Sequence, residues 1–189
     1  MTVGELRKAE LEKAAQILGF HRIKNLGFYD GNLHENQLPL LSDLIAREVD
    51  SVKPDVIIIY ERTGISLHLD HIAVSKAVID LFDAGRIKPQ KIYYFGLDKE
   101  MARLAGGERA WVDSQNHGAV IDVSSVWQTK LAAIKEHKTQ GADIKRMLKR
   151  YRQLKNNRGA NLHHEHFQLA RTTIDKRLSF PESDLLAST

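Results

Sequence analysis

The feature that most constrains the fold is a short apolar run followed by a helical repeat. Residues 56–60 read Val-Ile-Ile-Ile-Tyr, a β-branched run with the length of a buried strand. Apolar residues then recur with helical spacing from Ile72 to Phe82. Because a strand followed by a helix is the repeating unit of α/β proteins, this run predicts that class.

The same alternation recurs on both sides of this unit. Helical patterns cover residues 3–18, which Gly19 ends, and residues 40–49, while strand patterns cover 23–28, 91–95 and 119–123. The strands are apolar throughout, so we predict a mostly parallel sheet with helices on both faces. We place a single domain at 1–170 and a loose C-terminal tail at 171–189.

The later part of the chain is less regular. Residues 101–116 lack a clean period and contain two adjacent glycines, so we expect an irregular excursion there. Ser125 and Gln128 have capping-box spacing and predict a helix that runs towards His137, which we expect to brace the helix end. After Gly141 we expect a basic helix that runs to about residue 157.

Composition excludes several classes of protein. The 189 residues contain no cysteine, which excludes disulfides and thiolate zinc sites and favours a cytoplasmic location. No apolar run approaches the length of a membrane span. The net charge of +4 is mild, although seven cations lie between residues 145 and 158 without an acid. That run indicates an acidic partner or a solvated helix face. We favour the solvated face, because no nucleic-acid motif accompanies the charge.

The most chemically loaded stretch joins the central strand to its helix. His68, Asp70 and His71 lie beyond the carboxyl end of the strand, which is the edge where open α/β sheets bind ligands. A helix amino terminus favours neutral imidazole, the form that binds a metal. The alternative is that Asp70 is the N-cap of the helix and the two histidines are solvated first-turn residues.

Several short segments in one order together resemble the PIG-L/LmbE family of metal-dependent de-N-acetylases. They are Ala15-Gln16-Ile17-Leu18-Gly19, Leu26-Gly27-Phe28-Tyr29-Asp30-Gly31, Lys53-Pro54-Asp55, the stretch 64–74, Lys91-Ile92-Tyr93-Tyr94, the stretch 130–140 and Glu165-His166-Phe167. The resemblance implies a Rossmann-like, LmbE-like fold. It also implies a hydrolase that acts on a linear amide and removes acetyl from a small N-acetylglucosaminyl-type sugar conjugate.

The resemblance also implies roles for four residues. His71 corresponds to a ligand of the catalytic divalent metal, usually zinc. His68 and Asp70 correspond to a catalytic pair in which the carboxylate orients the imidazole, and the imidazole stabilises the oxyanion or protonates the leaving amine. Asp30 corresponds to a residue that binds sugar hydroxyls, and its alternative is an Asx-turn residue.

One departure from the family pattern is decisive. The His-Pro-Asp-Asp motif, which supplies the other ligands and the general base, is absent from the sequence. A zinc site needs about three protein ligands, and only His71 is assigned. We therefore expect an incomplete chain whose first strand is missing, and an aggregation-prone or weakly active product.

Other readings stay open. The chain is alternatively a complete, non-catalytic binding or assembly module, or a basic-helix binder of acidic partners. His163, His166 and Glu165 have a spacing that could hold a metal, but Glu165-His166-Phe167 resembles a helix start in the family remote from catalysis. The sequence leaves open an assembly of identical chains, and it makes nucleic acid an unexpected partner.

Overall fold

The computed structural model describes residues 1–33, 35–104, 110–142, 144–146, 148–149, 163–175 and 178–189. Contacts divide the chain into two compact units. Unit 1 is Met1–Asn25 with Asp122–His164, and unit 2 is Leu26–Ile121 with Glu165–Thr189. The basic helix predicted to end near residue 157 lies largely outside the described residues.

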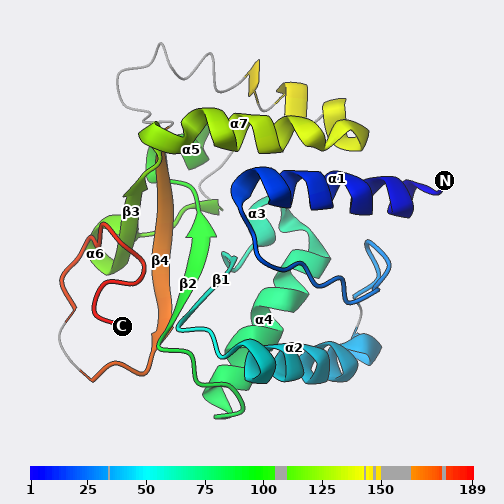
Figure 1. Ribbon diagram of the computed structural model, residues 1–189. Coiled ribbons are helices and arrows are strands. Elements are labelled where there is room, and N and C mark those ends of the chain that lie inside the picture. The colour runs from blue at the N-terminus through cyan, green and yellow to red at the C-terminus, as the bar shows by residue number, and fades with distance from the viewer. Residues whose placement is uncertain (34, 105–109, 143, 147, 150–162, 176–177) are drawn as a thin grey trace. The chain divides into compact units, whose positions relative to one another are not determined.

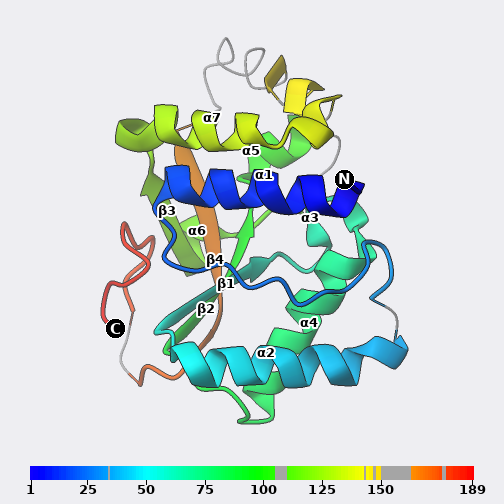
Figure 2. The same ribbon diagram turned by 45° about the vertical axis from the view of Figure 1, so that its right-hand side comes forward.

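Unit 1 is built on two helices that run side by side, α1 (Val3–Leu18) and α7 (Trp127–Glu136) (Figures 1 and 2). A capping box between Thr2 and Glu5 starts α1, and Gly19 ends it in the left-handed region with φ 75°. The helix predicted over 3–18 is therefore confirmed with its end. Within the unit, the Glu10 carboxylate accepts hydrogen bonds from the backbone and the hydroxyl of Thr139 at 2.9 and 2.7 Å.

The start of α7 differs from the prediction. Val126 is the N-cap and offers no side-chain hydrogen bond, so the capping box predicted from Ser125 and Gln128 does not form. A 3₁₀ turn at Ser124–Val126 precedes the helix, and Ser124 bonds instead to the Asp122 carboxylate. His137 is the C-cap, as expected for a residue that braces the helix end.

In the part of the chain that the structure describes, the sheet has four strands in the order β1-β2-β4-β3: β1 (Val56–Tyr60), β2 (Lys91–Gly96), β3 (Gly118–Asp122) and β4 (His164–Thr172). β1 pairs in parallel with β2, and β2 pairs antiparallel with β4. The α/β class is confirmed, with a mixed sheet. No strand forms at 23–28, and the resemblance was wrong in making Glu165-His166-Phe167 a helix start, because these residues lie in β4.

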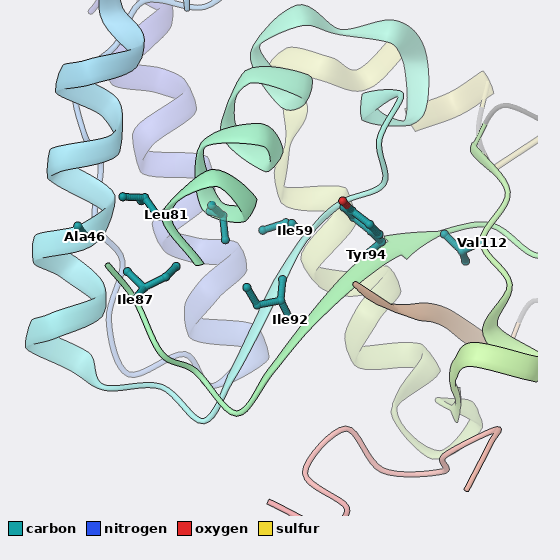
Figure 3. Close-up of a cluster of buried hydrophobic side chains, with 8 residues drawn as sticks. Ala46, Ile59, Leu81, Ile87, Ile92, Tyr94 and Val112 are labelled. Carbon is teal, nitrogen blue, oxygen red and sulfur yellow. The ribbon is translucent and has the colours of Figure 1, made fainter. Parts of the chain in front are cut away.

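One face of this sheet packs against two helices, α2 (Leu38–Val52) and α4 (Leu69–Asp83), which cross each other in both views (Figures 1 and 2). The core between them contains eight buried side chains: Ala46, Ile59, Val78, Leu81, Ile87, Ile92, Tyr94 and Val112 (Figure 3). Burying each large apolar side chain of this kind contributes about 1.5–3 kcal/mol. This core fixes β1 and α4, the two elements that meet at the site.

The other face of the sheet is covered in part by the C-terminal segment. Tyr93, Ala119 and Phe167 form a second buried cluster, and Leu185 packs against it. Glu182 is 7% exposed, and its backbone N–H donates to the Gly118 carbonyl at 2.8 Å. Residues 178–189 are therefore not the loose tail that the sequence predicted, because Glu182 anchors them to the sheet. The boundary predicted at residue 170 falls within β4.

Coverage of the two faces differs between neighbouring strands. Lys91 to Tyr94 of β2 are all buried, as predicted for a strand covered on both sides. In β1, however, Ile58 and Tyr60 remain 49 and 37% exposed, so the described residues leave their face of the strand partly uncovered.

Outside residues 105–109, which the structure does not describe, the segment between β2 and β3 contains the short helices α5 (Lys99–Leu104) and α6 (Ser114–His117), where the sequence predicted an irregular excursion. Immediately after α6, Gly118 lies so close to β4 that an added Cβ would be 1.8 Å from the Phe167 carbonyl oxygen.

Candidate active site

The candidate site lies where β1 ends and α4 begins, the edge that the sequence predicted. Between them α3 (Gly64–Leu67) is a distorted turn, and His68 is the N-cap of α4. Asp70 lies in the first turn, so the alternative that made it the N-cap is wrong. The Ser75 hydroxyl donates to the Tyr60 carbonyl at 2.9 Å and ties α4 to the end of β1.

Asp70 holds the turn at residues 30–33 against the first turn of α4. Its Oδ2 accepts the Gly31 N–H at 2.6 Å, and its Oδ1 accepts the Leu33 N–H at 3.0 Å. Burial raises the pKa of Asp70, but the hydrogen bonds from Leu33 and Gly31 and the nearby imidazoles outweigh it and lower the pKa below its usual value. Asp70 is therefore a carboxylate that organises backbone.

His68 faces a different carboxylate. Its Nε2 lies 3.5 Å from Oδ1 of Asp30, which the Asp70-bound turn brings to the site. Its Nδ1 is buried and makes no hydrogen bond with the described part of the chain. The resemblance implied that Asp70 orients His68, but the hydrogen bonds of the Asp70 carboxylate go to Gly31 and Leu33.

His71 is held from two sides. Its Nδ1 lies 3.0 Å from the Gly64 carbonyl oxygen. Because a carbonyl only accepts, this bond places the proton on Nδ1 and leaves a lone pair on Nε2. The Tyr60 ring stacks on the imidazole at 3.9 Å and 7°, and the His68 ring stacks at 4.6 Å and 24°. Histidines that bind a metal through one ring nitrogen usually donate the N–H of the other ring nitrogen to a carbonyl, carboxylate or water, as Nδ1 of His71 does here.

One group within the described residues could hold a metal ion. Ligand atoms of Asp30, His68 and Asp70 all lie within 4.8 Å of one another. Carboxylate oxygen with imidazole nitrogen suits a divalent ion such as Zn²⁺ or Mn²⁺, and the buried Nδ1 of His68 is a donor without a protein partner in that range. The donor chemistry therefore fits. His71 is adjacent through ring stacking but does not belong to this group.

The alternative metal ligands near the end of the chain are engaged elsewhere. His166 Nδ1 lies 2.9 Å from the Ser114 hydroxyl, and its Nε2 lies 3.4 Å from an Asp98 oxygen. In unit 1, the His163 ring packs against Trp127 at 4.9 Å. The structure therefore does not add them to the cluster at α4.

Sequence reasoning missed Glu61, which follows β1 directly and is 4% exposed. A carboxylate between an apolar strand and a Thr-Gly turn resembles an ordinary loop residue. Its burial, and the way its oxygens bond to the turn that leads to His71, are visible only in three dimensions.

Known proteins resemble this chain in sequence and in fold. A sequence model of the family described as "PIG-L: GlcNAc-PI de-N-acetylase" matches residues 1–82, which include the whole cluster. Two similar proteins are each named "Probable N-acetyl-alpha-D-glucosaminyl L-malate deacetylase 2". The one from Bacillus subtilis is 27% identical over 82% of this chain and 66% of its own length. The one from Bacillus cereus is 26% identical over 74% of this chain and 59% of its own length.

A solved structure shows the same fold. The conserved protein TT1542 from Thermus thermophilus superposes with a TM-score of 0.64 at 18% identity, over 95% of this chain and 79% of the other. The family model and the two curated relatives confirm the resemblance to the PIG-L/LmbE family that was inferred from the sequence. The chain spans 66 and 59% of the length of the two curated relatives. No helix within the described residues is long and apolar enough to cross a membrane.

Proposed function

We propose that this chain contributes the site of a metal-dependent hydrolase that removes acetyl from an N-acetylglucosaminyl conjugate. The observation that supports it most directly is the clustering of Asp30, His68 and Asp70 beside His71 at the carboxyl end of β1. The names of the similar proteins point to the amide of an N-acetylated glucosamine as the bond that is cut.

In this proposal His71 and the Asp30 carboxylate hold a divalent ion, with Zn²⁺ as the first candidate. Asp30 belongs to the group whose ligand atoms converge, whereas His71 lies beside that group and is the ligand that the family resemblance implies. When bound, such an ion polarises the amide carbonyl and activates the attacking water. His71 offers Nε2, because Gly64 accepts the proton on Nδ1. The chain supplies carboxylate and imidazole donors in one place, although the His-Pro-Asp-Asp motif of the family is not in the sequence.

His68 is proposed to donate the proton that the glucosamine nitrogen needs when the C–N bond breaks. Asp30 lies 3.5 Å from its Nε2 and is 67% exposed in its side chain, so it can also reach a sugar hydroxyl. Asp70 contributes indirectly, because its hydrogen bonds to Gly31 and Leu33 place Asp30 beside His68. The amide and one water then yield acetate and the protonated amine, and the proton that His68 donates is replaced by one released from that water.

The experiment measures acetate released from N-acetylglucosaminyl malate by the metal-loaded chain. We expect His71→Ala and His68→Ala to abolish release, and Asp70→Asn to lower it by about 10-fold or more, the scale of losing an outer-shell partner. Asp80→Asn is the matched control, because Asp80 is an exposed carboxylate of α4 that pairs with Lys76, and it should keep full activity.

A second candidate follows from the missing motif. If the chain binds the sugar conjugate but releases no acetate with Zn²⁺, Mn²⁺ or Co²⁺, it is a non-catalytic binding module with the same scaffold. Binding of acidic partners by residues 145–158, a cytoplasmic location and an assembly of identical chains remain predictions.

A further inference from the structure

Glu61 has a buried carboxylate that takes no part in the proposed reaction. It follows β1 directly and is 4% exposed. One oxygen, Oε2, accepts the Thr63 N–H at 2.7 Å. The other, Oε1, accepts the Thr63 hydroxyl at 2.6 Å and the Ile65 N–H at 2.7 Å. A single carboxylate therefore organises the turn that separates β1 from α4.

That turn has a backbone that its residues do not favour on their own. Gly64, Ile65 and Leu67 have φ values of 65°, 65° and 62°. Positive φ is ordinary for glycine but unfavourable for leucine, and more so for a β-branched residue such as isoleucine. Such a conformation persists only where the surroundings impose it. The three hydrogen bonds to Glu61, with Gly64 N–H donating to the Glu61 carbonyl at 2.8 Å, are the contacts that impose it here.

The turn ends against His71. The Gly64 carbonyl accepts the Nδ1 proton of His71 at 3.0 Å. A Cβ added at Gly64 would lie 2.9 Å from the His71 Cβ, so the backbone at residue 64 touches the base of this side chain. The orientation of one carbonyl therefore decides which nitrogen of His71 carries the proton.

We infer that Glu61 is a positioning residue that fixes His71 in the Nδ1–H form through the Gly64 carbonyl. The consequence for metal binding by Nε2 rests on the proposed function, whereas the control of the tautomer does not. A side chain that only stabilised the fold would leave the tautomer of His71 unchanged when it is replaced by a close relative.

The test measures the protonated ring nitrogen of His71 by long-range ¹H–¹⁵N correlation in ¹⁵N-histidine-labelled protein, at a pH where the imidazole is neutral. We expect a single Nδ1–H form in the native chain. In Glu61→Gln the amide nitrogen cannot accept an N–H, the turn relaxes, and a substantial fraction of His71 moves to the Nε2–H form. Zn²⁺ affinity should fall about 10- to 100-fold, the usual effect of losing an outer-shell partner.

The control is Asp43→Asn, which removes a charge of the same sign from an exposed pair with Arg86. It should leave both readouts unchanged. Unchanged tautomer in a folded Glu61→Gln protein would overturn the inference. If Glu61→Gln does not fold, Thr63→Val removes the hydroxyl bond to Oε1 and keeps the backbone bond from the Thr63 N–H, and an unshifted tautomer there would overturn the inference equally.

The two proposals fail in different ways. A native chain that shows the Nδ1–H form, loses it in Glu61→Gln and never binds Zn²⁺ would support the positioning role and contradict the metal-dependent function. If the native chain and Glu61→Gln bind Zn²⁺ with equal affinity and show the same His71 tautomer, the result would contradict the positioning role and support the metal-dependent function.

Discussion

Unit 2 contains two clusters of ionisable side chains that are built in opposite ways. The His68 cluster, which consists of Asp30, His68, Asp70 and His71, lies at the end of β1, where the His68 and Asp30 side chains are 37 and 67% exposed. The Lys91 cluster, which consists of Lys91, Tyr93 and Glu182, joins β2 to the C-terminal segment, and its lysine is 0% exposed.

The Lys91 cluster satisfies its own polar groups. Lys91 donates to Oε1 of Glu182 at 2.7 Å and to the Ala187 carbonyl, and the Tyr93 hydroxyl donates to Oε2 of Glu182. In the His68 cluster, by contrast, Nδ1 of His68 is buried without a hydrogen bond to any described residue. The difference between the two clusters is whether their polar groups are hydrogen-bonded to one another. A cluster whose donors and acceptors are all satisfied stabilises the fold, whereas one that leaves a buried nitrogen without a partner can bind a ligand.

The largest expected effect comes from opening the closed cluster. Glu182→Ala leaves Lys91 buried without its carboxylate, and removing one partner of a buried ion pair costs about 3–5 kcal/mol. Urea denaturation should show this loss in the free energy of unfolding. Glu182→Gln keeps an acceptor for Lys91 and should lose less.

The control for that measurement is an exposed pair in the same unit. Asp43→Ala removes the partner of Arg86 and should cost less than about 1 kcal/mol. Equal losses in Glu182→Ala and Asp43→Ala would show that the Lys91 cluster is not a closed, stabilising group.

A smaller effect is expected from Asp70→Ala. The Gly31 and Leu33 N–H groups lose a charged acceptor, which costs about 1–3 kcal/mol and is confined to the turn. Hydrogen exchange should quicken at these two amides. If the amides of β2 lost protection to the same extent, Asp70 would support the whole sheet, and the contrast between the two clusters would be wrong.

The free energy of unfolding should fall at alkaline pH because of Tyr93. Burial, then the hydrogen bond and charge of Glu182, raise the pKa of its hydroxyl above the usual value. The folded state therefore keeps this proton more tightly than the unfolded chain, whose tyrosine has a pKa near 10. The resulting stability is complete below about pH 10 and is lost above it, by about 1.4 kcal/mol per pH unit.

Comparing unfolding midpoints at pH 8 and pH 11 checks this expectation. The native chain should lose stability between the two, and Tyr93→Phe should lose less. Parallel losses in both proteins would assign the alkaline effect to another group.

The smallest effect is expected on the surface. Asp83 and Arg171 form a two-pronged pair at 2.7 and 2.8 Å, which lowers the pKa of Asp83. Because both side chains face solvent, Asp83→Asn should shift the denaturation midpoint by little more than the experimental error. If Asp83→Asn shifted the midpoint as much as Glu182→Ala does, burial would not be the reason that the Lys91–Glu182 pair stabilises the fold.

The sequence allowed much of the local structure to be predicted. β1 was found with both of its ends from its apolar run, and Gly19 marked the end of α1 because a left-handed residue is needed there. β4 was missed, since its alternation of polar and apolar residues becomes a strand only through pairing with β2. The strand predicted at 23–28 was wrong, because β propensity without a pairing neighbour does not form a strand.

The sequence brought the candidate site residues together but did not predict the contacts that they make. Spacing alone brought His68, Asp70 and His71 together, because they occupy one helix start. The bonds from Asp70 to Gly31 and Leu33 cross 39 and 37 residues, and the Lys91–Glu182 bond crosses 91. Contacts of that separation depend on the assembled sheet. Glu61 escaped notice because its importance comes from the backbone angles of the turn it holds.

Two glycines of this chain should tolerate substitution very differently if each codon is randomised and folded variants are selected. At Gly19 nothing lies within 4 Å of an added Cβ, so asparagine, which tolerates the left-handed region, should survive. At Gly118 any side chain would collide with the Phe167 carbonyl oxygen at 1.8 Å, and that oxygen belongs to a strand that cannot withdraw without breaking its pairing with β2. Codon 118 should therefore return glycine alone among folded clones, which makes it an internal standard for the stringency of any such screen.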